Sequence, residues 1–135
     1  MRALIVDDSE AMRSMLGTIL RNFGFEVLDA ADATEGFAQL RAKHPVDLAL
    51  VDWKMPGIDG LEFIRTVRKV PDYMGLRILM TTAVNDANNV ENALAAGADA
   101  YLLKPLRAAA LRETLGHMGF ARASGTRSPD PSNRA

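Results

Sequence analysis

Residues 46–51 read Val-Asp-Leu-Ala-Leu-Val, a short and mostly apolar run that leads directly into Asp52. A strand with one solvent-exposed face alternates apolar and polar residues, whereas a mostly apolar run is typical of a strand that is covered on both faces. Other short runs that can form strands stand at residues 3–6, 26–30, 77–81 and 100–103. The sequence therefore predicts five short strands, most of them buried.

A segment with the apolar spacing of a helix follows each of these runs. The first such segment begins at Ser9, a residue type that caps helices, and ends at Gly24. Asp32, with Glu35 three residues later, predicts the start of the second helix, and Pro45 closes it. The remaining helices are expected over the apolar positions from 61 to 70, from Asn85 or Asp86 to Gly97, and through Leu111, Leu115 and Met118 to Gly119.

Strands that alternate with helices through short links predict an α/β fold. Right-handed crossovers between parallel strands place helices on both faces of the sheet. We expect a doubly wound five-stranded parallel sheet, (βα)5 and flavodoxin-like, with strand order 2-1-3-4-5. Residues 1–120 are expected to form this domain, and residues 121–135, which hold almost no apolar bulk, a disordered polar tail.

The composition excludes several classes of protein. The 135 residues carry 16 basic and 17 acidic side chains, so there is no basic excess for direct binding of nucleic acid. Cysteine is absent, and His44 and His117 lack a ligand-spaced companion, which excludes thiolate sites and makes a histidine-built metal site or triad improbable. No apolar stretch approaches the roughly 20 residues of a membrane helix. We therefore expect a cytoplasmic protein with no membrane partner.

Polar and charged residues gather at the carboxyl ends of the expected strands, where open parallel sheets bind ligands. Asp7 and Asp8 follow the first strand and Asp52 the third, and these strands are neighbours about 4.8 Å apart. Three crowded carboxylates repel unless a cation is present, and hard oxygen ligands suit Mg²⁺, with Mn²⁺ as a substitute. The residues at the strand ends are Asp7, Asp8, Asp52, Thr81, Thr82 and Lys104.

Such a cluster favours phosphoryl chemistry. A divalent ion would bind one phosphoryl oxygen, Lys104 a second and the Thr82 hydroxyl a third. An aspartate among these groups is suited to accept a phosphoryl group, because catalysis of that transfer is mostly positioning and charge stabilisation. Taken alone, each residue has an ordinary explanation as a turn former, helix cap or surface lysine. Their common place at one end of one sheet is what favours a site.

These residues also match a known family. The chain resembles the receiver domains of two-component response regulators, and closely resembles the free-standing chemotaxis (CheY-like) type. The resemblance covers residues 1 to about 120 and implies a monomeric signalling protein, which is no enzyme beyond autocatalytic phosphotransfer and self-dephosphorylation. The matching motifs are Asp7-Asp8 in IVDDS, Asp52 in VDWKMPGIDG, Thr82 in MTTA, and Tyr101, Lys104 and Pro105 in YLLKP.

The resemblance implies a role for each residue of the cluster. Asp52 would accept a phosphoryl group from the phosphohistidine of a sensor histidine kinase or of a histidine phosphotransfer protein. Mg²⁺ would be held by Asp8, Asp52 and the backbone carbonyl of Lys54, and by Asp7 through water. Lys104 and Thr82 would bind the phosphoryl oxygens.

The resemblance also implies a switch and a shaped loop. Thr82 would move toward the phosphate and Tyr101 would turn inward, which would change the surface of the fourth helix, the fifth strand and the last helix. An output protein such as a flagellar motor switch would bind that surface. The bond before Pro105 is expected to be cis, and Pro56 and Gly60 to shape the loop after the acceptor.

Three further positions bear on the lifetime and the destination of the signal. In this family the residues two beyond the acceptor and two beyond the threonine flank the path of the attacking water, and here they are Lys54 and Val84. Neither side chain can act as a general base, so fast self-dephosphorylation is not expected. Leu106 stands where many chemotaxis-type relatives carry an aromatic residue, which leaves the output partner open.

Three other functions stay open at this point. A phosphorelay intermediate or phosphate sink would use the same site. A Mg²⁺-dependent aspartyl-phosphate phosphatase would also use an aspartate nucleophile, but those sites carry an acid two residues further on, where Lys54 stands. A flavodoxin-like binder shares the sheet order, but no Ser/Thr/Gly-rich phosphate loop follows the first strand, and Asp7 and Asp8 would repel a flavin phosphate.

Overall fold

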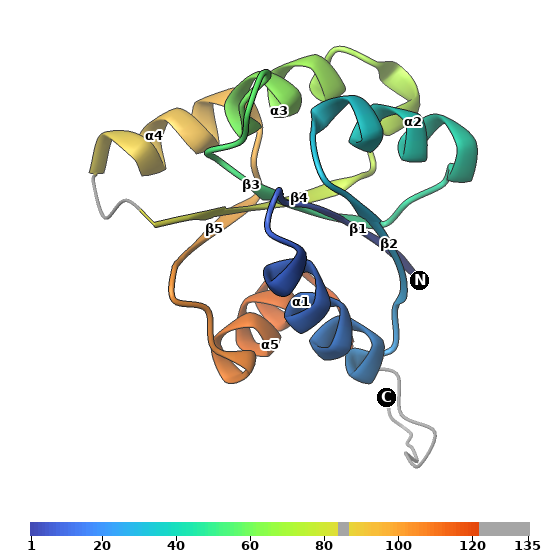
Figure 1. Ribbon diagram of the computed structural model, residues 1–135, viewed down its shortest axis with the longest axis vertical. Coiled ribbons are helices and arrows are strands. Elements are labelled where there is room, and N and C mark those ends of the chain that lie inside the picture. Colours follow the sequence, from blue (N-terminus) through green and yellow to red (C-terminus); the bar gives the residue numbers. More distant parts are fainter. Residues whose placement is uncertain (84–86, 122–135) are drawn as a thin grey trace.

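The computed structural model describes residues 1–83 and 87–121, which form a parallel sheet between two layers of helices (Figure 1). The strands are β1 (Arg2–Val6), β2 (Glu26–Ala30), β3 (Leu48–Asp52), β4 (Arg77–Thr82) and β5 (Ala100–Leu103). The helices are α1 (Glu10–Phe23), α2 (Ala33–Lys43), α3 (Gly60–Arg68), the 3₁₀ turn η1 (Pro71–Tyr73), α4 (Ala87–Ala96) and α5 (Ala108–His117). The strand order β2-β1-β3-β4-β5, with every pairing parallel, confirms the predicted fold class.

Two apolar clusters fill the space on the two faces of the sheet. Helices α2, α3 and α4 cover one face and α1 and α5 the other (Figure 1). All five residues of β3 are buried, with Ala49 and Val51 in one cluster and Leu48 and Leu50 in the other. This explains why the sequence of β3 shows no polar alternation, since neither of its faces meets water.

The helix ends follow the predicted signals where the structure describes them. The Ser9 hydroxyl caps α1 and the Asp32 carboxylate caps α2, each accepting a hydrogen bond from a backbone N–H three residues later. Gly24 ends α1 with a φ of 121°, a conformation that favours glycine. The predicted cap of α4 at Asn85 or Asp86 lies outside the described residues. Among residues 1–83 and 87–121, no helix has the length and apolar character needed to cross a membrane.

Strand β3 begins and ends slightly later than the apolar run predicts. The backbone N–H of Arg2 donates to the Asp47 carboxylate at 2.7 Å, so a side chain takes the place of a ladder carbonyl at this end. At the other end, Trp53 N–H donates to the Thr81 carbonyl at 3.0 Å. Asp52 therefore lies inside the ladder, paired in register with Thr81, rather than after it.

Helix α3 ends at Arg68, before the predicted position of Val70. A residue that precedes proline is disfavoured in the helical region. Val70 precedes Pro71 and is extended, with φ −96° and ψ 115°. The chain then makes the single turn η1 before it enters β4.

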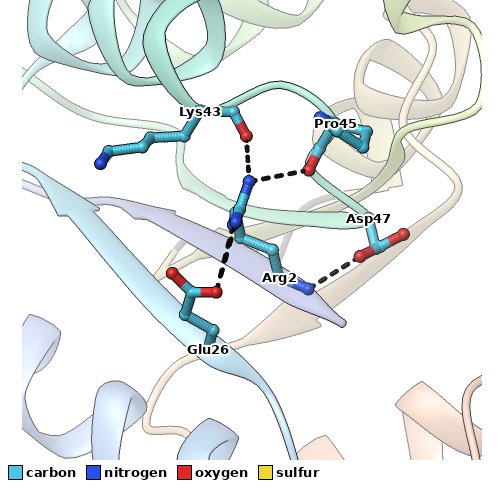
Figure 2. A network of polar contacts seen from close by, with 5 residues as sticks. All are labelled: Arg2, Glu26, Lys43, Pro45 and Asp47. Atoms are coloured by element: carbon cyan, nitrogen blue, oxygen red, sulfur yellow. Dashed lines mark hydrogen bonds and ion pairs between the residues drawn. The ribbon is translucent and has the colours of Figure 1, made fainter.

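Arg2 holds together the end of the sheet opposite the predicted site (Figure 2). Its guanidinium donates to the backbone carbonyls of Lys43 and Pro45 and lies 3.4 Å from the Glu26 carboxylate. Its backbone N–H binds Asp47, as described above. The network joins β1, β2, the end of α2 and its link to β3, and it therefore fixes the end of the sheet opposite the predicted site.

Candidate functional site

Three aspartates from two neighbouring strands come together at the carboxyl edge of the sheet. Asp7 and Asp8 follow β1, and Asp52 ends β3, which pairs directly with β1. One carboxylate oxygen from each lies within 4.8 Å of the other two. Asp7 and Asp52 are 1% and 6% exposed, whereas Asp8 is exposed. The acidic cluster, as we call these three residues, is therefore closed at its base and opens to solvent at Asp8.

Lys104 places a cation against the acidic cluster. Its Nζ lies 3.0 Å from Oδ1 of Asp52, with which it forms a hydrogen bond, and 3.6 Å from Oδ2 of Asp7. The Lys104–Pro105 peptide bond is cis, as the family resemblance implies. One ammonium group against three carboxylates leaves the cluster with net negative charge.

Burial raises the pKa of the Asp52 carboxyl above its ordinary value. Loss of hydration is the largest cause, and the hydrogen bond from Lys104 opposes it. The neighbouring charges of Asp7 and Asp8 raise the pKa further. Ionisation of Asp52 is therefore harder in the folded protein than in the unfolded chain, and a bound cation would ease it.

One buried oxygen of Asp7 has no hydrogen-bond donor within the described part of the chain. Oδ1 accepts from the Ser9 N–H at 2.9 Å, but Oδ2 has no such partner, and Lys104 Nζ stays 3.6 Å away. A buried carboxylate oxygen without a donor is unfavourable by about 1–3 kcal/mol. A divalent cation or one of its waters would satisfy it, and carboxylate oxygens are the ligands that Mg²⁺ prefers. The residues present fit such an ion.

Strand β4 brings two buried threonines to the same edge. Thr81 pairs in register with Asp52, and Thr82 is the last residue of the strand. Lys104 N–H donates to the Thr82 carbonyl at 2.8 Å, which ties the backbone of the lysine to β4. The structure thus brings Thr82 to the edge where sequence analysis predicts it.

The loop between β3 and α3 walls a cavity beside the acidic cluster. The cavity has a volume of about 510 Å³ and gives access to Asp8 from solvent. Within this loop the Lys54 side chain is exposed, whereas Met55 is buried and Trp53 packs against the same core cluster. The lining residues are Asp8, Trp53, Lys54, Met55, Pro56, Gly57 and Asp59.

Gly60 lies against the backbone that carries Asp52. Its N–H donates to the Trp53 carbonyl at 2.7 Å. A Cβ atom at this position would stand 2.4 Å from the Asp52 carbonyl oxygen and 2.9 Å from the Trp53 Cα. Gly60 therefore determines how closely the start of α3 packs on the end of β3.

Some predicted residues stand outside this cluster. Tyr101 lies on the edge strand β5 with 38% of its surface exposed. Val84 lies outside the described residues. His44 and His117 are exposed at helix ends.

One residue that the sequence did not predict also touches the acidic cluster. Arg13 of α1 donates through its guanidinium to the Asp7 carbonyl at 2.7 Å and pairs with Asp29 of β2 at 3.4 Å. The only signal in the sequence is a cation shortly after an acidic pair, which by itself predicts no contact.

Sequence comparison relates most of the chain to one family and to named relatives. The sequence model for the response regulator receiver domain matches residues 3–116. Chemotaxis protein CheY-3 of Vibrio cholerae is 34% identical over 115 residues, which cover 85% of this chain and 88% of that protein. Chemotaxis protein CheY of Pseudomonas aeruginosa is 35% identical over 117 residues, with 85% and 93% covered. The matched region contains all five strand ends described above.

Comparison of folds gives the same result. The structure of CheY4 from Vibrio cholerae superposes with a TM-score of 0.81 at 34% identity and covers 86% of this chain and 96% of that one. A CheY-like receiver domain from Methanospirillum hungatei has a TM-score of 0.78 at 36% identity, with 87% and 91% covered. Similarity in sequence and in fold thus extends over most of the chain.

Replacement of Gly60 by alanine is expected to destabilise the protein by about 2–3 kcal/mol, because a methyl group would press on the Asp52 carbonyl. The matched control is Gly116→Ala in α5, where a Cβ meets no atom within 4 Å. That control is expected to gain about 0.5–1 kcal/mol from helix propensity. Urea unfolding measures both, and equal free energies of unfolding for the two variants would contradict the packing described here.

The Asp52→Asn variant is expected to be more stable than wild type at pH 7 without divalent ions, because it removes a buried carboxylate beside two others. The folded-state pKa of Asp52 is raised, so the folded protein keeps a proton that the unfolded chain loses above its ordinary pKa of 3.8. The contribution of Asp52 to the stability of the wild type therefore falls as the pH rises from 3.8 through the raised pKa of the folded state.

The difference between the two proteins should accordingly shrink as the pH is lowered toward 4, which urea unfolding at several pH values would show. A less stable Asn variant at pH 7 would mean that the ion pair with Lys104 outweighs the loss of hydration of Asp52.

Proposed function

This chain belongs to the receiver domains of two-component response regulators, of CheY type, and from this premise we propose that it carries a transient phosphoryl group on Asp52. The observation that carries the proposal is the 3.0 Å contact between Lys104 Nζ and Asp52, made inside a cluster of three carboxylates. Phosphoryl transfer needs a positioned nucleophile and compensation of developing charge, and this edge of the sheet supplies both.

In the proposed reaction a carboxylate oxygen of Asp52 attacks the phosphorus of a phosphohistidine. The new O–P bond forms as the P–N bond breaks, and the electron pair of the broken bond stays with the imidazole nitrogen of the donor. Asp52 is the best placed of the three carboxylates, because Asp8 is exposed and Asp7 is engaged by the Ser9 N–H. The donor would be a sensor histidine kinase or a histidine phosphotransfer protein.

The acidic cluster would hold Mg²⁺ through Asp8, Asp52 and the Lys54 carbonyl, and through Asp7 by way of water. The ion, when bound, supplies positive charge that neutralises the carboxylates and attracts phosphoryl oxygens. Lys104 would bind another phosphoryl oxygen as a mobile point charge. The Thr82 hydroxyl would bind a third oxygen from the end of β4.

The proposed output surface is formed by α4, β5 and α5. A phosphoryl group adds negative charge and strong acceptors beside Thr82, whose movement would leave room for Tyr101 to turn inward. Leu94 of α4 and Tyr101 of β5 are 49% and 38% exposed, and they offer apolar area that a partner could cover. The partner we propose is a chemotaxis component such as a flagellar motor switch, since the two relatives above are named chemotaxis proteins.

Beryllofluoride, a stable mimic of the phosphoryl group, is expected to change the fluorescence of Trp53 when Mg²⁺ is present. Trp53 follows Asp52 directly and lines the adjacent cavity. Asp52→Asn should abolish the response. The matched control is Asp59→Asn, which removes a carboxylate from the same cavity but keeps a residue type that caps α3. If the fluorescence of the wild type did not change, the proposal would be overturned. An undiminished change in Asp52→Asn would mean that beryllofluoride binds at another residue.

Protein treated with beryllofluoride and Mg²⁺ is expected to bind a peptide from a flagellar motor switch more tightly than untreated protein does. Leu94→Ser should weaken this binding several-fold without changing the beryllofluoride response, because it removes exposed apolar area away from the acidic cluster. Fluorescence anisotropy of the labelled peptide measures the affinity of both proteins. Reversible transfer to a histidine phosphotransfer protein without any peptide binding would instead favour a role as a relay or phosphate sink.

A further inference from the structure

Arg13 connects three elements at the base of the acidic cluster. From α1, its Nη1 donates to the Asp7 carbonyl at 2.7 Å, and its Nε lies 3.4 Å from Oδ2 of Asp29 on β2. The Arg13 side chain is 16% exposed, so most of its length is packed. A contact to a backbone carbonyl with a second anchor on a neighbouring strand is held in place better than a lone surface ion pair.

Asp7 is fixed through three of its polar groups. Its N–H donates to the Ala30 carbonyl at 3.1 Å, its Oδ1 accepts from the Ser9 N–H at 2.9 Å, and its carbonyl accepts from Arg13. The remaining group, Oδ2, faces Lys104 Nζ at 3.6 Å and has no hydrogen bond within the described residues. These contacts leave Oδ2 directed at the cluster.

Arg13 acts where β3 no longer pairs with β1. The pairing of β1 with β3 ends at Val6 and Val51, one residue before Asp7. The carbonyl of Asp7 and the N–H of Asp8 belong to the same planar peptide unit. A group that holds this carbonyl therefore also orients the start of Asp8, whose side chain is exposed.

We propose that Arg13 is a positioning residue that aligns the Asp7-Asp8 pair for one divalent cation, with Asp29 as its anchor. The proposal rests on the function proposed above, since it assumes that the acidic cluster binds Mg²⁺. Partners that orient metal ligands from behind typically change metal affinity by roughly 10- to 100-fold when they are removed.

The direction in which Mg²⁺ affinity changes on removal of Arg13 distinguishes a positioning role from a purely electrostatic one. The guanidinium is a positive charge near a site for a positive ion, so on charge alone its removal should tighten binding. If Arg13 positions the ligands, its removal should weaken binding instead. A purely structural role would lower stability and leave the dissociation constant for Mg²⁺ unchanged.

The test is a titration of the full chain with Mg²⁺ at fixed ionic strength, followed by Trp53 fluorescence. We expect Arg13→Gln to raise the dissociation constant about tenfold. Arg13→Lys should recover part of the affinity, because an ammonium reaches the carbonyl but lacks the second contact. The matched control, Arg21→Gln, removes an exposed charge from the last turn of the same helix and should bind Mg²⁺ as wild type does.

Asp29→Asn provides a second variant, which should fold even if Arg13→Gln does not, because Asp29 is exposed. It should raise the dissociation constant in wild type and have no further effect when Arg13 is already Gln. An unchanged or lower dissociation constant in Arg13→Gln, or equal effects of Asp29→Asn in both backgrounds, would overturn the proposal. A wild type that binds no Mg²⁺ would instead overturn the proposed function, so the two failures are distinguishable.

Discussion

The burial of two like charges side by side is the constraint on which this end of the molecule depends. Asp7 and Asp52 stand at the ends of adjacent parallel strands, which lie about 4.8 Å apart, and little water screens them. Lys104 compensates part of the charge at 3.0 and 3.6 Å. In the proposed function, the negative charge that Lys104 leaves uncompensated would attract a divalent cation, and the bound ion would then attract a phosphoryl group.

The core holds this unfavourable arrangement in place. Residues of β3 point alternately into the two apolar clusters, so a slip of one residue would send each side chain to the opposite layer. The register of Asp52 with Thr81 is thereby tied to the packing of the whole strand. Gly60 adds a second constraint, because its close approach fixes the backbone of Asp52 from the side of α3.

The sheet and the acidic cluster could be predicted from the sequence, because parallel strands end at one edge and each strand is a separate apolar run. That rule alone places Asp7, Asp8, Asp52 and Lys104 at a common edge. It could not predict Arg13, since a bond from a side chain to a carbonyl leaves no mark in the pattern of residue types. It also placed Asp52 beyond its strand, because the ladder bond from the Trp53 N–H depends on the neighbouring strand.

Whether Asp52 is the phosphoryl acceptor can be determined by locating the phosphoryl group on the chain. Full-length protein treated with acetyl phosphate and Mg²⁺ would be reduced with borohydride, which converts an aspartyl phosphate to homoserine, and its peptides would be weighed by mass spectrometry. We expect one modified residue, Asp52, in the wild type and none in Asp52→Asn. Modification of Asp7 or Asp8 in the wild type, with Asp52 unchanged, would contradict this expectation.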